Sequence, residues 1–148
     1  MRSTMTTGVL EPLSQSNIEL ANTMEDIRGR KVHDRDGQEF GKVDDEFVDP
    51  YERLARFISV KSGDILGIGG ERRLVPIEAV RLDGDHVVIN ATSSQIADGP
   101  KLVDRDVEAM ASTAQTSSGA APIILEAYEF YAVQDPFWSP SYRRPTWS

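Results

Sequence analysis

The stretch Gly29–Asp49 constrains the fold of this chain more than any other. Two runs of alternating apolar and polar residues flank a short polar reversal that contains Asp36-Gly37. Asp-Gly between two alternating runs is a strong signal for a β-hairpin, because the turns that match strand twist need positive φ angles at their central residues. We therefore expect a hairpin that turns at Asp36-Gly37 and sets the register of the strands around it.

Further short strands are predicted on the carboxy-terminal side of this hairpin. Gly41 interrupts the alternation in its second strand, and a glycine inside a strand often marks a bulge or a sharp bend. Turns are indicated at Asp49-Pro50 and at Asp83-Gly84. About five short strands separated by such turns predict a small antiparallel barrel, whose closure would remove free strand edges. The segments expected to contain strands are 27–32, 40–48, 56–60, 74–80 and 86–90.

Length and composition fit one small domain with extensions. The chain has 148 residues and a net charge of −8, and the excess acid lies outside residues 27–90, which are nearly balanced. A pI near 4.7 argues against a nucleic-acid partner, since such proteins usually carry a basic patch. The absence of cysteine excludes disulfides, thiolate metal sites and cysteine nucleophiles. No apolar run is long enough to cross a bilayer or to act as a secretory segment, so we expect no membrane insertion and a cytoplasmic location.

The order and spacing of the strand segments resemble the PRC-barrel domain over roughly residues 25–92. That family is named for the H subunit of the photosynthetic reaction centre, and related barrels form the carboxy-terminal domain of a ribosome-maturation factor. The resemblance implies a mainly β fold: a small antiparallel PRC-type β-barrel with short carboxy-terminal helices and an extended aromatic tail. It rests on pattern and spacing, without a catalytic signature. The matching segments are Ile27–Val32, Asp36-Gly37 with Gly41–Val43, Asp49, Phe57–Val60 and Val75–Val80.

Four segments are expected along the chain. Within the first, Val9, Leu10 and Leu13 are candidates to dock on the body of the protein. The four are a flexible lead-in over residues 1–25, the PRC-barrel domain over 26–92, short helices and a polar linker over 93–121, and an aromatic, proline-rich docking segment over 122–148.

The carboxy-terminal half favours helices over strands. Ser93–Asp98 fits a helical turn capped by Ser93 or Ser94, and Asp104–Ala111 fits a short helix with acids in its first turn. Ser112–Ala121 is small and polar and has the composition of a linker. The apolar stretch 122–133 fits either a helix or a strand, with a slight preference for a helix.

Most of the aromatic residues of the chain gather after residue 127. Disordered tails are usually poor in aromatics, and Tyr, Trp and Arg are enriched at interface hot spots. This segment is therefore expected to dock, with three alternatives: on its own barrel, on a second subunit, or on a foreign partner. The candidate interaction residues are Tyr128, Phe130, Tyr131, Phe137, Trp138, Tyr142, Arg143, Arg144 and Trp147.

Other candidate sites favour structural interpretations. The acids Asp44-Asp45-Glu46 and Asp49 are expected on a solvated strand face, and Asp34-x-Asp36-Gly37 lacks the third acid and the closing Glu of a calcium loop. The stretch Leu66–Glu71 lacks the full fingerprint of a phosphate-binding loop. His33 and His86 are each expected inside a strand, with no serine elbow beside them. We thus expect no catalytic residue, no cofactor and no metal.

The favoured function is a non-enzymatic protein-binding or scaffolding module that forms a homo-oligomer through its barrel surface and its tail. The family resemblance implies two alternatives. One is a soluble accessory subunit of a membrane photosynthetic or electron-transfer complex, although the membrane anchor of the H subunit is missing here. The other is a ribosome-maturation-type accessory factor, although 25 residues cannot supply that factor's amino-terminal domain.

Overall fold

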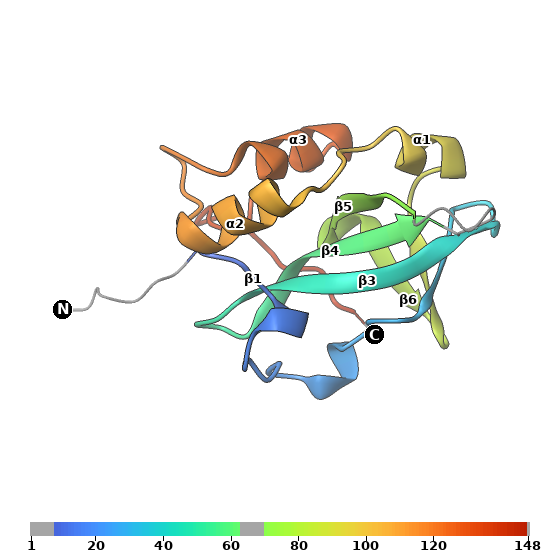
Figure 1. Cartoon of the computed structure of the whole chain (residues 1–148), viewed down its shortest axis with the longest axis horizontal. Helices are drawn as coiled ribbons and strands as arrows, with labels where there is room; N and C mark the ends of the chain where they lie inside the picture. The colour runs from blue at the N-terminus through green and yellow to red at the C-terminus, as the bar shows by residue number, and fades with distance from the viewer. Residues whose placement is uncertain (1–7, 63–69, 148) are drawn as a thin grey trace.

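A computed structural model of the chain describes residues 8–62 and 70–147. Its strands form one curled sheet; α1 and α3 lie above this sheet, and α2 lies at one end of it below α3 (Figure 1). In chain order the elements are β1 (Glu11–Pro12), η1 (Leu13–Gln15), η2 (Thr23–Glu25), β2 (Lys31–His33), β3 (Glu39–Asp49), β4 (Leu54–Ser62), β5 (Arg72–Pro76), η3 (Ile77–Ala79), β6 (Val80–Asp83), β7 (His86–Ile89), α1 (Ser93–Ala97), α2 (Asp104–Ser112) and α3 (Pro122–Phe130).

The predicted hairpin is confirmed, with a different turn. Strands β2 and β3 pair antiparallel. Gly37 has a φ of 86°, whereas Asp36 keeps a negative φ, so the reversal is not the two-residue turn that needs both angles positive. Gly37 N–H donates to the Asp34 carbonyl (3.0 Å) and Asp34 N–H donates to the Gln38 carbonyl (2.8 Å). The Asp34 carboxylate also accepts from the amides of Asp36 and Gln38, so Asp34 organises the loop.

The sheet is an open, curled path of strands. Its order is β5-β4-β3-β2-β7-β6, and β1 pairs with β3 beside this path. The expectation of a purely antiparallel barrel is wrong at one step, because β7 returns to the free side of β2 and pairs with it in parallel. The described strands also form a half-barrel: β5 and β6 are the two ends of the path, joined through η3. Segment 100–102 covers the outer edge of β5 through bonds between Leu74 N–H and the Pro100 carbonyl and between Leu102 N–H and the Arg72 carbonyl.

Two hydrophobic clusters lie on the two faces of the curled sheet. The first fills the inside of the curl, where Val32, Ile58 and Val87 are fully buried and Trp147 joins them from the end of the chain. The second lies between the sheet and the helices α2 and α3, centred on Phe57 and its neighbours. Full burial of one such side chain stabilises the fold by about 1.5–3 kcal/mol, so both faces contribute to stability.

Residues 8–25 run along the sheet. Val9, Leu10 and Leu13 are buried, which confirms the predicted docking of these three residues. Strand β1 pairs with the far end of β3, with Glu11 opposite Val48. The chain then continues through η1 and η2 and covers one face of β3 before it enters β2.

The carboxy-terminal segments fold over the outer face of the sheet. Helix α1 is capped by Thr92, one residue before the expected caps, and Gln95 completes a capping box with it. Helix α2 confirms the predicted helix over 104–111, and α3 settles the apolar stretch after Pro122 as helical. The expected linker contains a buried side chain, Gln115, which accepts from Ala121 N–H at 2.7 Å.

The extended course expected for the tail is not confirmed. Its chain bends at hydrogen-bonded turns, in which Ser139 N–H donates to the Pro136 carbonyl and Tyr142 N–H donates to the Ser139 carbonyl. In Figure 1 the tail passes behind the sheet and ends below it, on the side away from α1 and α3. The tail's buried aromatic residues are divided between the two hydrophobic clusters, with Phe137 in the outer one and Trp147 in the inner one.

Candidate functional site

An aromatic cluster joins α3 and the tail to the outer face of the sheet. The ring of Tyr128 lies 5.0 Å from that of Phe57 on β4 and 6.1 Å from that of Trp138. Phe137 and Trp138 meet edge to face at 5.3 Å, an arrangement that aromatic pairs prefer. The Tyr128 hydroxyl accepts from Phe137 N–H at 3.2 Å, which fixes the start of the tail on α3.

Beyond this cluster the tail covers a buried arginine. Arg56 on β4 is 5% exposed, and its guanidinium lies over the rings of Phe137 (5.1 Å) and Tyr142 (5.7 Å). Such cation–π contacts strengthen when the cation is removed from water. The guanidinium Nη2 lies 3.9 Å from the Asp49 carboxylate and 3.6 Å from that of Glu52. The tail thus covers the Arg56 side chain, while Glu52 beside it is half exposed.

Tyr142 also links the tail to the η3 corner. Its hydroxyl donates to the Glu78 carboxylate. Burial raises the pKa of Glu78 above its ordinary value, and the hydrogen bond from Tyr142 opposes this rise. Burial, together with that same carboxylate, raises the pKa of Tyr142, so the hydroxyl remains a hydrogen-bond donor at neutral pH.

The last described residues attach the tail to the amino-terminal segment. The Arg144 guanidinium reaches both oxygens of Glu25 at the end of η2, with distances of 3.0 and 3.4 Å, and also donates to the Ala55 carbonyl. Both side chains are largely buried. Arg144 lies 5.6 Å from the ring of Trp147, whose indole is buried in the inner cluster. A paired fork of this kind holds the end of the tail beside η2.

Within the single chain, the structure places most of the predicted interaction residues against the chain's own barrel. Tyr128, Phe137 and Trp147 are buried, and Tyr131, Trp138, Tyr142 and Arg144 are partly buried. Phe130 and Arg143 are exposed. The sequence analysis missed the partners Glu25, Arg56 and Glu78, and the one available signal was the position of Arg56 in an otherwise apolar strand.

The expectation of a solvated acidic face on β3 is wrong for Asp45, Glu46 and Asp49, which are buried. The reason is a bulge: Val43 pairs with Val60 but Asp45 pairs with Ser59, so Asp44 is left out and strict alternation fails. Asp44 alone of the four acids is exposed. The segment before β2 covers Asp45 and Glu46 through Ser14 and Ile27.

Each buried acid of β3 has backbone donors. Ser14 directs both its N–H (3.1 Å) and its hydroxyl to Asp45. Asp49 Oδ1 accepts from the amides of Tyr51 and Glu52 and closes the turn between β3 and β4. Glu46 Oε1 accepts from Ile27 N–H at 3.0 Å.

Glu46 is the most perturbed acid in the described part of the chain. Its side chain is fully buried, and Oε2 has no hydrogen-bond partner within that part. Burial raises the pKa of Glu46 to about 8, the Ile27 amide opposes the rise, and the nearby negative charge of Asp26 adds to it. At neutral pH this carboxyl is therefore largely protonated, a state that suits an acid in an apolar surrounding.

A second group of charged residues surrounds an open hollow beside β2 and β7. His33 and His86 lie in the predicted strands, and their rings stack with centroids 4.2 Å apart. His86 also lies 3.6 Å from Asp83 and 3.5 Å from Asp85. The hollow has a volume of about 680 Å³, and basic side chains form much of its rim. Its lining consists of Arg28, Gly29, Arg30, Lys31, His33, Asp85 and His86.

Most of the glycine-rich stretch Leu66–Glu71 lies outside the described residues. In the part of the chain that is described, His, Asp and Glu side chains form no group of three or more suited to a metal ion. Across residues 8–62 and 70–147, no helix has both the length and the apolar character needed to cross a membrane.

The outer face of α3 carries the exposed apolar side chains of this region. Leu125 is 51% exposed and Phe130 is 41% exposed, with Glu126 and Glu129 between them along the helix. The Phe130 ring lies against Gly99, where an added Cβ atom would come within 3.3 Å of it. Beside it is a hollow of about 500 Å³ lined by Asp98, Gly99, Pro100, Lys101, Glu126, Glu129 and Phe130.

Comparison with known families gives one match. A family model described as the PRC-barrel domain matches residues 22–96, half of the chain. The match begins at η2, includes every strand from β2 to β7 and ends in α1. No curated protein matches the chain.

Proposed function

The chain belongs to the PRC-barrel domain family, and on that premise we propose that it is a cytoplasmic, non-enzymatic protein-binding or scaffolding module that assembles with copies of itself. The two exposed apolar side chains of α3 are the observation that carries this proposal. Leu125 and Phe130 remain open to solvent although the tail aromatics around them pack inward. In this proposal the tail has a supporting role: it fixes α3 on the sheet and so presents the binding face.

The chemistry of this face suits a protein partner. Aromatic residues are enriched in the centres of interfaces, where they bury much area with little loss of side-chain entropy. Phe130 stands at the edge of a hollow that could receive a partner side chain. Glu126 and Glu129 lie between Leu125 and Phe130 on the exposed side of α3, and Lys101 adds a positive charge beside them. In a two-fold dimer the same surface patch of each copy faces that of the other. A patch that carries both positive and negative charges can therefore form ion pairs with its own copy.

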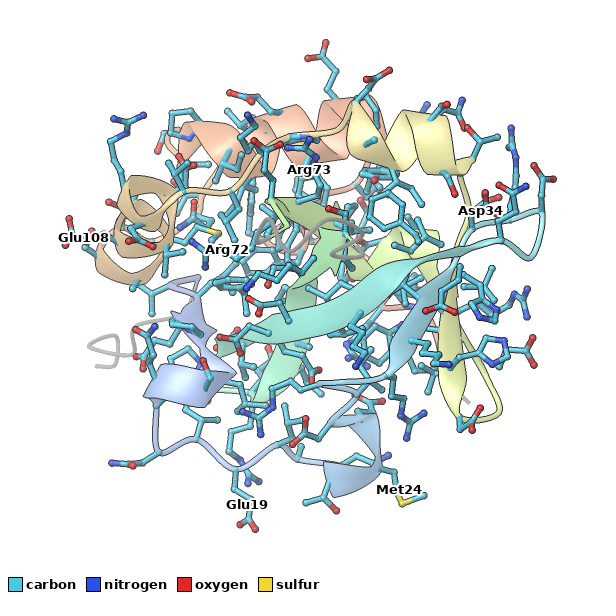
Figure 2. All side chains as sticks on the ribbon, turned by 45° about the vertical axis from the view of Figure 1, so that its right-hand side comes forward. Glu19, Met24, Asp34, Arg72, Arg73 and Glu108 are labelled. Carbon is cyan, nitrogen blue, oxygen red and sulfur yellow. The ribbon has the colours of Figure 1, made fainter. Side chains whose placement is uncertain are left out.

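The α3 face can be tested by measuring mass in solution. Size-exclusion chromatography with light scattering, over a range of concentrations, should show a dimer or larger assembly. We expect Leu125→Asp and Phe130→Asp to give monomers, because each would replace one of the exposed apolar side chains of α3 by a charge. Met24→Asp is the matched control: Met24 is 75% exposed and lies at the opposite side of the molecule from α3 (Figure 2). Circular dichroism would establish that every variant is folded.

Two results would count against the proposal. One is a wild-type monomer at every concentration, and the other is an assembly that both α3 variants leave intact. Co-sedimentation of the wild type with ribosomes or with a membrane complex would instead support one of the family-derived alternatives. Removal of residues 122–148 is a less informative test, because it would also uncover Phe47, Phe57 and Leu74 on the sheet.

A further inference from the structure

The guanidinium of Arg56 is a buried charged group with an unsatisfied hydrogen-bond donor. The side chain is only 6% exposed, yet its nearest carboxylate oxygens, on Asp49 and Glu52, lie beyond hydrogen-bond distance at 3.9 and 3.6 Å. Nε is buried and has no hydrogen-bond partner within the described residues. The guanidinium carbon lies over the rings of Phe137 and Tyr142, but no hydrogen bond joins it to either residue.

Such a group is unusual in a folded protein. A guanidinium carries five N–H donors in one plane and no acceptor. Buried polar atoms nearly always have a hydrogen-bond partner, whether from the protein, from water or from a ligand. Leaving a charged donor unpaired costs more than leaving a neutral one unpaired. Arg56 is therefore suited to a hydrogen-bond partner that the described residues do not supply.

A cavity adjoins this side chain. Its volume is about 390 Å³, inside the range of about 300–1,000 Å³ typical of small-molecule sites. Arg56, Asp49 and Glu52 form its charged side, and Phe137 and Trp138 form an aromatic side. The remaining wall comes from Gly8 and from the loop Gln115, Thr116 and Ser117.

This remaining wall is held in place by hydrogen bonds. Gln115 is 1% exposed and uses its side-chain amide to bind the backbone at Met110, Thr113 and Ala121. Its N–H also donates to the Gly8 carbonyl at 3.1 Å. The loop after α2 and the start of the described chain are thus fixed relative to each other, and the cavity is a built feature of the fold.

The charges in the cavity define the class of ligand. One guanidinium faces two carboxylates, so the site is acidic overall and would repel an inorganic anion. A guanidinium fork pairs best with a carboxylate, whereas the carboxylates of Asp49 and Glu52 would pair with an ammonium group. We propose that the Arg56 cavity binds a small amino carboxylate, whose carboxylate pairs with Arg56 and whose ammonium group pairs with Asp49 and Glu52. This proposal does not rest on the protein-binding role of α3.

The test measures binding and its location together by NMR. Glycine, β-alanine and 4-aminobutanoate serve as probes, and acetate, methylamine and inorganic phosphate serve as single-charge controls. At least one amino carboxylate should shift the signals of Arg56 Nε–H and of the Thr116 and Ser117 amides in a saturable way. We expect acetate and methylamine to bind at least about tenfold more weakly than the best amino carboxylate, because each lacks one of the two charged contacts.

Two variants separate binding from folding. Ser117→Tyr places a bulky side chain at the mouth of the cavity, on an exposed loop, and should abolish the shifts while leaving the protein folded. Ser94→Tyr, at an exposed serine of α1, is the matched control and should bind as the wild type does. The proposal is overturned if none of the three probes binds, if phosphate or acetate binds as tightly as the best probe, or if Ser117→Tyr leaves binding unchanged.

Discussion

The buried carboxyl of Glu46 should make the protein less stable as the pH rises. In the folded chain its pKa is about 8, against 4.5 for an ordinary glutamate. Between these values the unfolded chain has already lost the proton that the folded chain keeps. The folded state therefore binds more protons, and the free energy of unfolding must decrease with rising pH across this window.

The size of the effect follows from the two pKa values. Each unit of difference corresponds to about 1.36 kcal/mol, so complete titration of Glu46 would cost about 5 kcal/mol of stability between pH 4.5 and pH 8. Relaxation of the site and entry of water would reduce this value, and we expect at least about 2 kcal/mol to remain. That is a large share of the stability of a small domain.

The change Glu46→Gln removes the titration and keeps an oxygen for the Ile27 amide. Urea unfolding, followed by circular dichroism from pH 5 to pH 9, should show the variant close to the wild type at pH 5 and clearly more stable above pH 8. Comparing the two proteins at each pH cancels the acids that do not interact with Glu46. Asp26 does interact with it, but a hydrogen bond with Arg28 lowers the pKa of Asp26, so Asp26 stays ionised from pH 5 to pH 9. Asp44→Asn, at the exposed acid of the same strand, is the control and should show no such divergence. A constant difference between Glu46→Gln and the wild type from pH 5 to pH 9 would refute the reasoning.

Two further predictions use the same unfolding assay, one at Gly41 and one at Arg144, each with a control variant. Gly41→Ala should cost about 3 kcal/mol or more, because a Cβ atom there would lie 1.9 Å from the Lys61 carbonyl oxygen; Gly119→Ala, where the space is open, should be nearly neutral, and equal stability of the two variants would contradict this steric account. Arg144→Ala should cost about 2 kcal/mol, since it leaves the largely buried Glu25 unpaired. Arg28→Ala removes the more exposed pair with Asp26 and should cost less than about 1 kcal/mol; an equal cost for the two arginines would show that burial of the Arg144 pair adds nothing.

The local pattern of the sequence was sufficient for much of the fold. Asp36-Gly37 located the hairpin because the turn residues and the alternation lie within one short stretch. Asp83-Gly84 located the β6–β7 turn for the same reason. The apolar stretch that begins at Pro122 fitted either a helix or a strand by its spacing. The preferred helix is confirmed, and its buried residues lie on one face. These features depend on neighbours within a few residues.

The parallel pairing of β2 with β7 could not be read in the same way. It joins Val32 to Val87 across four intervening strands, and hydrophobic alternation does not specify which strand a β-strand will pair with. The turn at Asp34 shows a related limit. Its carboxylate accepts from Ser93 as well as from the loop amides, so a residue far along the chain helps to fix the hairpin.

Glu46 and Arg56 show why the candidate site was harder to predict than the strands that carry it. A charged residue in a strand is normally assigned to the solvent face, because burying an unpaired charge is costly. Here each is covered by a segment from outside its own hairpin: the chain before β2 covers Glu46, and the tail covers Arg56. Those segments supply only part of what each charge requires, since Glu46 Oε2 and Arg56 Nε both remain unpaired within the described residues. Glu46 can avoid the cost by keeping its proton, whereas an arginine cannot lose its charge. The difference in chemistry therefore makes Glu46 a determinant of pH-dependent stability, and it makes Arg56 the position at which an external carboxylate is most strongly favoured.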